Sequence, residues 1–342
     1  MKNLTIIGGG PAALMLAAQI DTKKYQVTLC EKKKTVGRKF LVAGEGGLNL
    51  TYNSSTEELI NQYSPSNFMA PILHQFTNED LINWLQHHKI STFTGSSNRV
   101  FPDLGIKPIE VLKKIVDFIE TKKIKFNVDT KWLGWDEEGH LSFEKNTITD
   151  ADIVVYAMGG ASWKVTGSDG QWSRSFEKRG IKILPFRAAN CAFKVDWKTN
   201  FITTHEGKPL KNIALTFNNS IAKGELVVSK FGLEGNAIYA LSQKIQDMLL
   251  TEKSTLIYLD LKPTMTVLQL KEKYKKSTRT KVTDILKKDI NLDRTSIGIL
   301  KHFTNKDTFS NPELLVEIIK SVPITIKSSG ELDKAISSLG GI

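Results

Sequence analysis

The chain has 342 residues, of which 40% are hydrophobic and 24% charged, and its formal net charge at pH 7 is +11. This length suits two domains of roughly 150 residues each, and the composition is that of a globular enzyme rather than of a disordered or fibrous protein. No apolar run comes near the ~18 residues of a membrane span, and the first predicted strand leaves no room for a signal peptide before it. The two cysteines, Cys30 and Cys191, have neither metal nor redox spacing. We therefore expect a cytoplasmic protein with no membrane partner.

The start of the chain follows the order strand, glycine-rich turn, helix, strand, acid. We predict a buried parallel strand at 4–7, a small-residue helix from 11 to about 20, and a second strand at 26–30. This order is typical of a dinucleotide-binding unit. The alternative is an ordinary βαβ unit whose turn happens to be rich in glycine.

Particular residues of this unit have physical tasks in binding a dinucleotide. Gly8 allows the tight turn, Gly10 lets the backbone approach a pyrophosphate, and Ala13 lets the helix lie close to the strand. The helix N-terminus offers N–H groups and a positive dipole end to phosphates. Glu31, at the end of the second strand, is placed to accept the ribose hydroxyls of an adenosine.

Loops, helices and strands follow as far as residue 184. A glycine-rich loop at 32–52 is expected to be functional, because loops of this length without periodicity usually are. The other predicted elements are helices at 56–63, 66–74, 78–87 and 109–120, a turn at 94–98, a strand at 124–128, a hairpin at 132–144 and a buried parallel strand at 151–157.

From about residue 185 the pattern changes to short alternating runs that favour strands. Strands are predicted at 192–195, 213–217, 221–227, 255–259 and 325–327, and helices at 236–250, 267–276, 280–288, 296–303 and 311–320. The positive charges are densest at Lys271, Lys273, Lys275, Lys276, Arg279, Lys281, Lys287 and Lys288. A nucleic-acid partner is one interpretation of this basic balance, and a solvated lysine-rich surface is the other.

Several motifs occur in an order that resembles a known family. They are Gly37-Arg38-Lys39, Gly44-Glu45-Gly46-Gly47-Leu48-Asn49, Arg99-Val100-Phe101-Pro102, Gly159-Gly160-Ala161-Ser162 and Gly167-Ser168-Asp169-Gly170. Together with the glycine turn they make the chain similar to the YhiN/BaiN-type NAD(P)/FAD-dependent flavoproteins. Motifs at 185–191, 232–240 and 260–263 extend the likeness over essentially the whole chain.

The resemblance implies an α/β fold in three parts. A Rossmann-like FAD-binding domain with a parallel sheet, of the ββα three-layer type, would occupy 1–185. An inserted β-barrel-like and helical substrate domain would occupy 186–328, and 329–342 would return to the first domain. Family members continue into a segment that closes over the flavin, whereas this sequence stops at Ile342. Either the sequence is a fragment of a longer protein, or the protein has lost this FAD-capping segment, and we favour the fragment.

The resemblance also implies FAD along the glycine turn, with NAD(P)H as a possible electron donor. Besides Gly8, Gly10, Ala13 and Glu31, the residues it would bring to the cofactor are Pro11, Ala12, Lys32, Arg38, Lys39, Gly44, Gly46, Asn49, Ala157, Gly159 and Gly160. The commoner family loop carries an arginine and a cysteine where this chain has Gly47 and Leu48. No role for that thiol is therefore carried over.

The candidate catalytic side chains are Lys39, Asn49 and Arg99. Lys39 could stabilise negative charge on a reduced flavin, contact a phosphate, or be solvated. Asn49 could hydrogen-bond the flavin edge or cap a turn, and Arg99 could position the substrate or form a structural ion pair. Because we find no histidine with acids at ligand spacing, no metal is expected.

Three functions agree with these patterns. The first is an FAD-dependent oxidoreductase, an NAD(P)H-driven reductase of an activated C=C bond in an unknown small-molecule or RNA substrate. The second is an RNA- or ribosome-associated protein, either a flavin-dependent RNA uridine reductase or a non-catalytic relative. The third is an NAD(P)-binding enzyme without flavin, which the loop at 37–51 disfavours because a simple dehydrogenase has no use for it.

Overall fold

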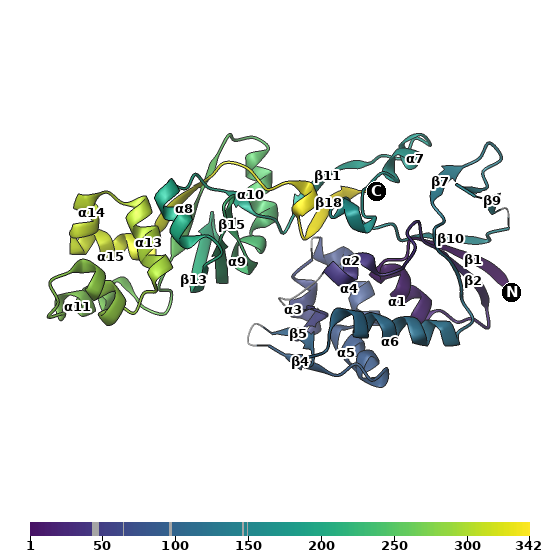
Figure 1. The fold of residues 1–342 in the computed structure, drawn as a ribbon, viewed down its shortest axis with the longest axis horizontal. Coiled ribbons are helices and arrows are strands. Elements are labelled where there is room, and N and C mark those ends of the chain that lie inside the picture. The colour runs from purple at the N-terminus through teal and green to yellow at the C-terminus, as the bar shows by residue number, and fades with distance from the viewer. Residues whose placement is uncertain (43–47, 64, 96–97, 146, 149) are drawn as a thin grey trace. The chain divides into compact units, whose positions relative to one another are not determined.

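The computed structural model describes residues 1–342 except 43–47, 64, 96–97, 146 and 149 (Figure 1). The chain divides into two compact units. The first comprises Met1–Leu184 with Gly341–Ile342, and the second is Pro185–Gly340. Each unit is described by itself below, and the roles predicted for the domains stay predictions.

A four-stranded parallel sheet forms the centre of the first unit. Its order is β10-β1-β2-β6, with β1 at Lys2–Ile7, β2 at Tyr25–Cys30, β6 at Lys125–Asn127 and β10 at Ile153–Tyr156. Ile7, the last residue of β1, pairs with Cys30 on one side and with Tyr156 on the other. The carboxyl ends of three neighbouring strands are therefore level at one edge of the sheet.

Two layers cover this sheet, one on each face (Figure 1). Helices α1 (Pro11–Gln19) and α6 (Pro108–Thr121) pack against Leu4, Ile6 and Leu29. On the other face, Ile7 and Cys30 pack against the antiparallel sheet of β7 (Trp132–Trp135), β8 (Leu141–Phe143) and β9 (Thr147–Ile148), with α7 (Ser173–Glu177) beside it. The Rossmann-like α/β fold with three layers is thus confirmed.

Two predictions in this unit need correction. The loop predicted at 32–52 contains a helix, α2 (Arg38–Val42), and a short strand, β3 (Thr51–Tyr52). The strand predicted as buried at 151–157 is only half-buried over Ile153–Tyr156, because β10 is an edge strand with a single neighbour in the described sheet.

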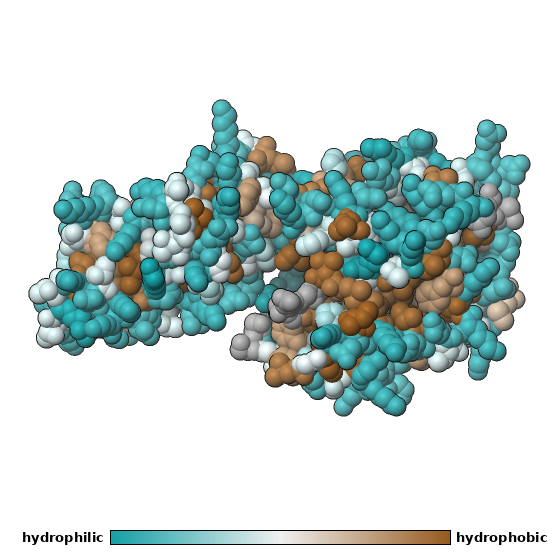
Figure 2. Space-filling view, in the orientation of Figure 1, coloured by the Kyte–Doolittle hydropathy of each residue, from teal (hydrophilic) through white to brown (hydrophobic). Residues whose placement is uncertain are grey.

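The remainder of the first unit is a small sheet with three helices. The sheet has the order β3-β5-β4, with β4 at Thr92–Thr94 and β5 at Arg99–Pro102. The helices are α3 (Thr56–Ile60), α4 (Ser66–Gln75) and α5 (Asn78–His87). Helix α4 has no buried residue, and its Phe68 and Ile72 are 68% and 51% exposed. Apolar side chains gather on the face of the first unit that Figure 2 shows.

The second unit is built on a six-stranded antiparallel sheet that closes on itself. Its order is β12-β15-β14-β13-β16-β17. The strands are β12 (Phe193–Lys194), β13 (Pro209–Phe217), β14 (Ser220–Val228), β15 (Gly232–Glu234), β16 (Thr255–Asp260) and β17 (Val322–Ile326). Lys194 of β12 bonds to the residues that directly follow β17. Its N–H donates to the carbonyl of Ser328 at 2.8 Å, and its carbonyl accepts the N–H of Lys327 at 3.2 Å. These bonds join the two ends of the sheet, as expected for the β-barrel-like arrangement.

Helices cover this sheet and complete the second unit. They are α8 (Thr199–His205), α9 (Asn236–Tyr239), α10 (Ser242–Leu249), α11 (Val267–Lys275), α12 (Val282–Asp284) with a π-helical turn at Ile285–Asp289, α13 (Arg294–Phe303), α14 (Lys306–Ser310) and α15 (Pro312–Lys320). Strands β11 (Leu184–Ala189) and β18 (Ser337–Gly341) pair with each other. None of the helices in the described residues has the length and apolarity needed to cross a membrane.

Candidate dinucleotide site

The carboxyl ends of β1, β2 and β10 border a cavity of about 800 Å³. This volume is within the range of cofactor pockets, about 300–1,000 Å³, and open α/β sheets bind ligands at this edge. The predicted cofactor residues that line the cavity are Gly8, Gly10, Pro11, Ala12, Glu31, Lys32, Arg38, Lys39, Ala157 and Gly159.

The other predicted site residues lie elsewhere. Ala13 is buried in α1 against the sheet, and the carbonyl of Gly160 accepts a hydrogen bond from Ser168 Oγ. Asn49 lies two residues before β3, and Arg99 is the first residue of β5; neither is among the residues that line the cavity. Gly44 and Gly46 fall within 43–47, outside the described residues.

The glycine turn has the geometry that its sequence predicts. Gly8 has a φ of +107°, and a Cβ there would lie 2.4 Å from the carbonyl oxygen of Ala157, so only glycine fits. A Cβ on Gly10 would meet nothing within 4 Å. The backbone at Gly10 therefore faces open space in the cavity, as required if a phosphate is to approach it.

Helix α1 leaves its first turn open to a ligand. Its N-cap is Gly10, which has no side chain to cap the helix, and Pro11 has no N–H to satisfy. The N–H of Leu14 donates to the carbonyl of Gly10 at 3.0 Å and so begins the helical ladder. Uncapped amides and the positive end of the helix dipole both favour an anion here.

Glu31 is held against this turn. One carboxylate oxygen accepts the N–H of Gly9 at 2.6 Å and the other accepts the N–H of Lys33 at 2.8 Å. Each carboxylate oxygen has two lone pairs, so both can accept a further hydrogen bond. The carboxylate thus orders the turn and keeps the capacity to accept ribose hydroxyls.

Two lysines from the segment after β2 reach the segment after β10. Lys32 Nζ forms a 2.8 Å ion pair with Asp169, and Lys39 Nζ donates to Ser162 Oγ at 2.8 Å. Burial opposes ionisation of Asp169, but the hydrogen bonds from Lys32 and from the N–H of Gln171 outweigh it and lower the pKa of the carboxyl. Burial also lowers the pKa of Lys39.

Aromatic residues that the sequence analysis did not single out form part of the cavity wall. Trp132, Tyr156 and Trp172 line it, and the rings of Trp132 and Tyr156 lie 5.3 Å apart. They come from β7, from β10 and from the residue just before α7, so only the fold brings them together. Cys30 also lines the cavity, but burial raises the pKa of its thiol to about 11, which leaves it a protonated, unreactive group.

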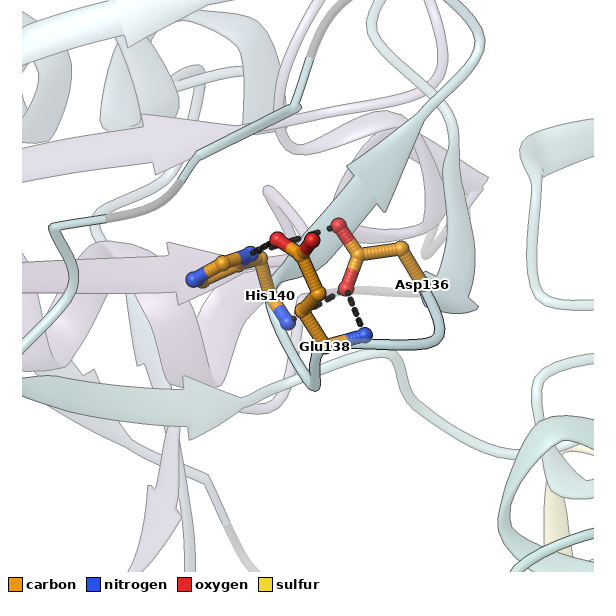
Figure 3. A group of neighbouring side chains, drawn as sticks. All are labelled: Asp136, Glu138 and His140. Carbon is orange, nitrogen blue, oxygen red and sulfur yellow. Dashed lines mark hydrogen bonds and ion pairs between the residues drawn. The ribbon is translucent and has the colours of Figure 1, made fainter.

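Three potential metal ligands meet at the turn between β7 and β8 (Figure 3). Asp136, Glu138 and His140 place one ligand atom each within 4.8 Å of one another, so the expectation that no histidine has acids at ligand spacing is wrong for His140. Asp136 Oδ1 accepts the N–H groups of Glu138 and His140, while His140 Nδ1 lies 3.4 Å from Asp136 and 3.3 Å from Glu138. These contacts account for the group as an ordered turn.

Residues 2–342 match the family described as HI0933-like protein Rossmann domain. The chain belongs to the HI0933-like family. The match spans the glycine turn, the loop after β2 and the second unit, and it confirms the predicted membership of a Rossmann flavoprotein oxidoreductase family.

Curated relatives of this HI0933-like protein include a reductase and two RNA-modifying enzymes by name. A 3-dehydro-bile acid delta(4,6)-reductase from Clostridium scindens is 24% identical over 80% of this chain and 68% of its own length. Ribosomal RNA dihydrouridine synthases from Haemophilus influenzae and Escherichia coli are 27% and 24% identical over 69% of this chain. The match spans only 60% and 59% of these two enzymes.

Among solved structures, a 3-ketosteroid-delta4-(5alpha)-dehydrogenase from Rhodococcus jostii RHA1 aligns with 99% of this chain and 84% of its own chain, with 12% identity and a TM-score of 0.44. A flavocytochrome c3 fumarate reductase aligns with 62% of this chain and 47% of its own chain, with 11% identity and a TM-score of 0.43.

Proposed function

We propose that this protein binds FAD in the cavity at the carboxyl ends of β1, β2 and β10 and acts as an oxidoreductase. The observation that carries the proposal is the free space in front of Gly10, beside the uncapped N-terminus of α1. A backbone approach of this kind is what a dinucleotide pyrophosphate needs. Glu31 would accept the adenosine ribose, and the wall of Trp132 and Tyr156 would exclude water from the adjoining part of the cavity.

The proposed reaction is the reduction of an activated C=C bond with NAD(P)H as electron donor. When bound, FAD supplies the hydride chemistry, and the protein supplies orientation and electrostatics. The reductase and the dihydrouridine synthases among the relatives support a reduction rather than another flavin reaction. Arg38 and Lys39, both lining the cavity, would place positive charge beside the cofactor.

Purified protein with bound FAD should be yellow, with flavin absorbance near ~450 nm. The series Gly10→Ala and Gly10→Val tests whether the free space is the binding site. We expect Gly10→Ala to lower FAD affinity and Gly10→Val to lower it further. The melting temperature of the cofactor-free protein should change little, because a Cβ at this position meets no protein atom within 4 Å. Flavin uptake that Gly10→Val leaves unchanged would place the cofactor elsewhere.

Electron donor and substrate are tested on the loaded protein. NADH and NADPH are compared for bleaching of the flavin under anaerobic conditions, followed by reoxidation with enones of the steroid class or with uridine-containing RNA. Bleaching by neither donor would contradict the NAD(P)H part of the proposal. Reoxidation by neither substrate class would contradict the C=C part.

An RNA substrate is favoured by one feature of the second unit. On α11 and the turns after it, Lys275, Lys281, Lys287 and Lys288 are exposed and make no ion pair within the described residues. Lysines arranged in this way bind phosphates by releasing counterions, so RNA retention should fall steeply with salt. Salt-sensitive RNA binding by a protein that takes up no flavin would instead indicate a non-catalytic RNA-associated relative.

A further inference from the structure

The backbone segment that carries Lys39 is bonded to the glycine turn. The N–H of Gly37 donates to the carbonyl of Gly9 at 2.7 Å, and α2 starts at the next residue. Gly37 has a φ of +68°, and a Cβ there would lie 2.6 Å from Leu112 Cδ1, so a larger residue would be strained and would require the buried Leu112 side chain to shift. Lys39 is thus two residues beyond a backbone bond that ties its segment to the turn.

The side chain of Lys39 then reaches across the end of β1. Its partner, Ser162, is fully buried in the segment after β10, whereas Lys39 lies in the segment after β2. In the sheet, β1 lies between β10 and β2, and the ends of the three strands are level. A bond between the two outer segments therefore lies over the middle strand, the one that carries the glycine turn.

The charge of Lys39 has no counter-charge in the described part of the chain. Ser162 is neutral, and none of the ion pairs found there includes Lys39. Lys32 and Lys131, which line the same cavity, are each paired with a carboxylate, Asp169 and Glu144. Burial lowers the pKa of Lys39, the effect expected of a cation removed from water without compensation. A half-buried ammonium that faces a cavity and forms no ion pair with the described residues favours an anionic ligand.

We propose that Lys39, positioned by Ser162, binds the diphosphate of the dinucleotide. The inference rests on the proposed use of this cavity for FAD, but it concerns only the half of FAD that ADP shares. The diphosphate is favoured over the flavin ring as the partner of Lys39 because the lysine segment is tied to Gly9, next to the open backbone of Gly10 and the N-terminus of α1. The side chain would thus add a charge-assisted bond to the backbone contacts.

The experiment is calorimetric titration of the cofactor-free protein with adenosine, ADP and FAD. Lys39→Met is expected to weaken ADP and FAD by roughly 10- to 100-fold, the usual size of a lost charged hydrogen bond, and to leave adenosine unchanged. Lys113→Met is the matched control, because Lys113 is exposed on α6 and the variant makes the same change in net charge. It should bind all three ligands as the wild type does.

The pH dependence of ADP affinity shows whether Ser162 positions the ammonium of Lys39 or only supports the fold. In the wild type, affinity for ADP should fall at a pH below the ordinary range of lysine, as Lys39 loses its proton. Lys39→Arg should remove this alkaline decline, since a guanidinium stays charged. Ser162→Ala should move the decline along the pH axis and leave adenosine binding alone, whereas a purely structural serine would weaken all three ligands together.

Each result decides between assignments. If Lys39→Met binds ADP within twofold of the wild type, the diphosphate role is wrong, and a loss confined to FAD would assign Lys39 to the flavin half. A wild type that binds ADP no better than adenosine overturns the inference as well. A wild type that binds ADP through Lys39 but does not take up FAD leaves the diphosphate site standing and contradicts the proposed flavin function. Failure to bind any of the three ligands contradicts both.

Discussion

The carboxylate of Glu31 accepts the N–H of Gly9 at 2.6 Å, so the acid at the end of β2 fastens the glycine turn at the end of β1. Its second oxygen accepts the N–H of Lys33. An acid in this position is usually discussed only as a ribose ligand. Here the same side chain also satisfies two backbone donors, which links the stability of the site to its proposed binding function.

Glu31→Gln should therefore destabilise the cofactor-free protein as well as weaken nucleotide binding. The amide keeps one acceptor oxygen but turns its NH₂ toward the N–H of Gly9 or of Lys33, and one unsatisfied donor costs about 1–3 kcal/mol. Urea unfolding without ligand measures this cost. Glu144→Gln, which changes an acid in a half-exposed ion pair with Lys131, should cost less than about 1 kcal/mol. Equal costs for the two variants would mean that Glu31 does not support the turn.

Gly8→Ala should be more destabilising than a glycine substitution that meets backbone strain alone. At Gly8 the new Cβ would lie 2.4 Å from the carbonyl oxygen of Ala157, and φ is +107°. Gly180 also has a positive φ, +75°, but a Cβ there meets nothing within 4 Å. Gly180→Ala should cost about 1–2 kcal/mol from strain, and Gly8→Ala that amount plus the cost of moving β10. Thermal melts of the two variants compare them directly, and similar losses would rule out the close contact with Ala157.

The first unit shows which features local sequence could predict. The turn at Gly8 and Gly10 and the strands around it depend on patterns within some thirty residues, and the structure has them. The bond between Lys39 and Ser162 and the ion pair between Lys32 and Asp169 join residues 123 and 137 positions apart. Because no spacing rule connects residues so far apart in the sequence, their pairing follows only from the sheet order.

The same reason explains the incorrect predictions. Whether the apolar run of β10 is buried depends on whether a further strand lies beyond it, and none does in the described sheet. The five residues of α2 are too few to show a helical period above a glycine-rich background. The aromatic wall of Trp132 and Tyr156 required the hairpin to pack over the parallel sheet, which its own sequence does not specify.

The ion pair between Lys32 and Asp169 should slow the release of bound FAD. Like the bond of Lys39, it joins the segments on either side of β1, and both of its residues line the cavity. Its side chains are 28% and 29% exposed, so the coupling should be at most about 1 kcal/mol, or roughly a fivefold change in rate. Lys32→Met, Asp169→Asn and the double variant, followed by flavin fluorescence on release, give that coupling as a double-mutant cycle.

A control pair defines the baseline for this cycle. Lys145 and Asp129 also form an ion pair, but they are 61% and 56% exposed and do not line the cavity. Substitutions there should leave the release rate unchanged. Release rates that add without coupling in the Lys32 and Asp169 cycle would show that the pair does not act across the cavity.

The second unit should lose stability as the pH falls below neutrality, because burial lowers the pKa of both His205 and His302. Burial is the larger cause for each, and the neighbouring charges of Arg294 and of Lys198 add to it. A histidine whose folded pKa lies below its unfolded value binds more protons when unfolded. Stability is therefore complete above the ordinary value of 6.5 and is lost as the pH falls through 6.5 toward the folded value.

Hydrogen exchange in α8 and α13 between pH 7.5 and 5.5 should follow this loss, with a slope of at most about 1.4 kcal/mol per pH unit for each histidine. His302→Phe should flatten the slope, because it removes a titrating group whose Nδ1 is buried without a hydrogen-bond partner in the described chain. His87→Gln, which changes an exposed histidine of α5 in the first unit, should not. Since the rings of Trp197 and His302 lie 5.3 Å apart, protonation in the folded state would also alter the fluorescence of Trp197. A slope that survives His302→Phe without change would assign the proton uptake to His205 or to acids of the same unit.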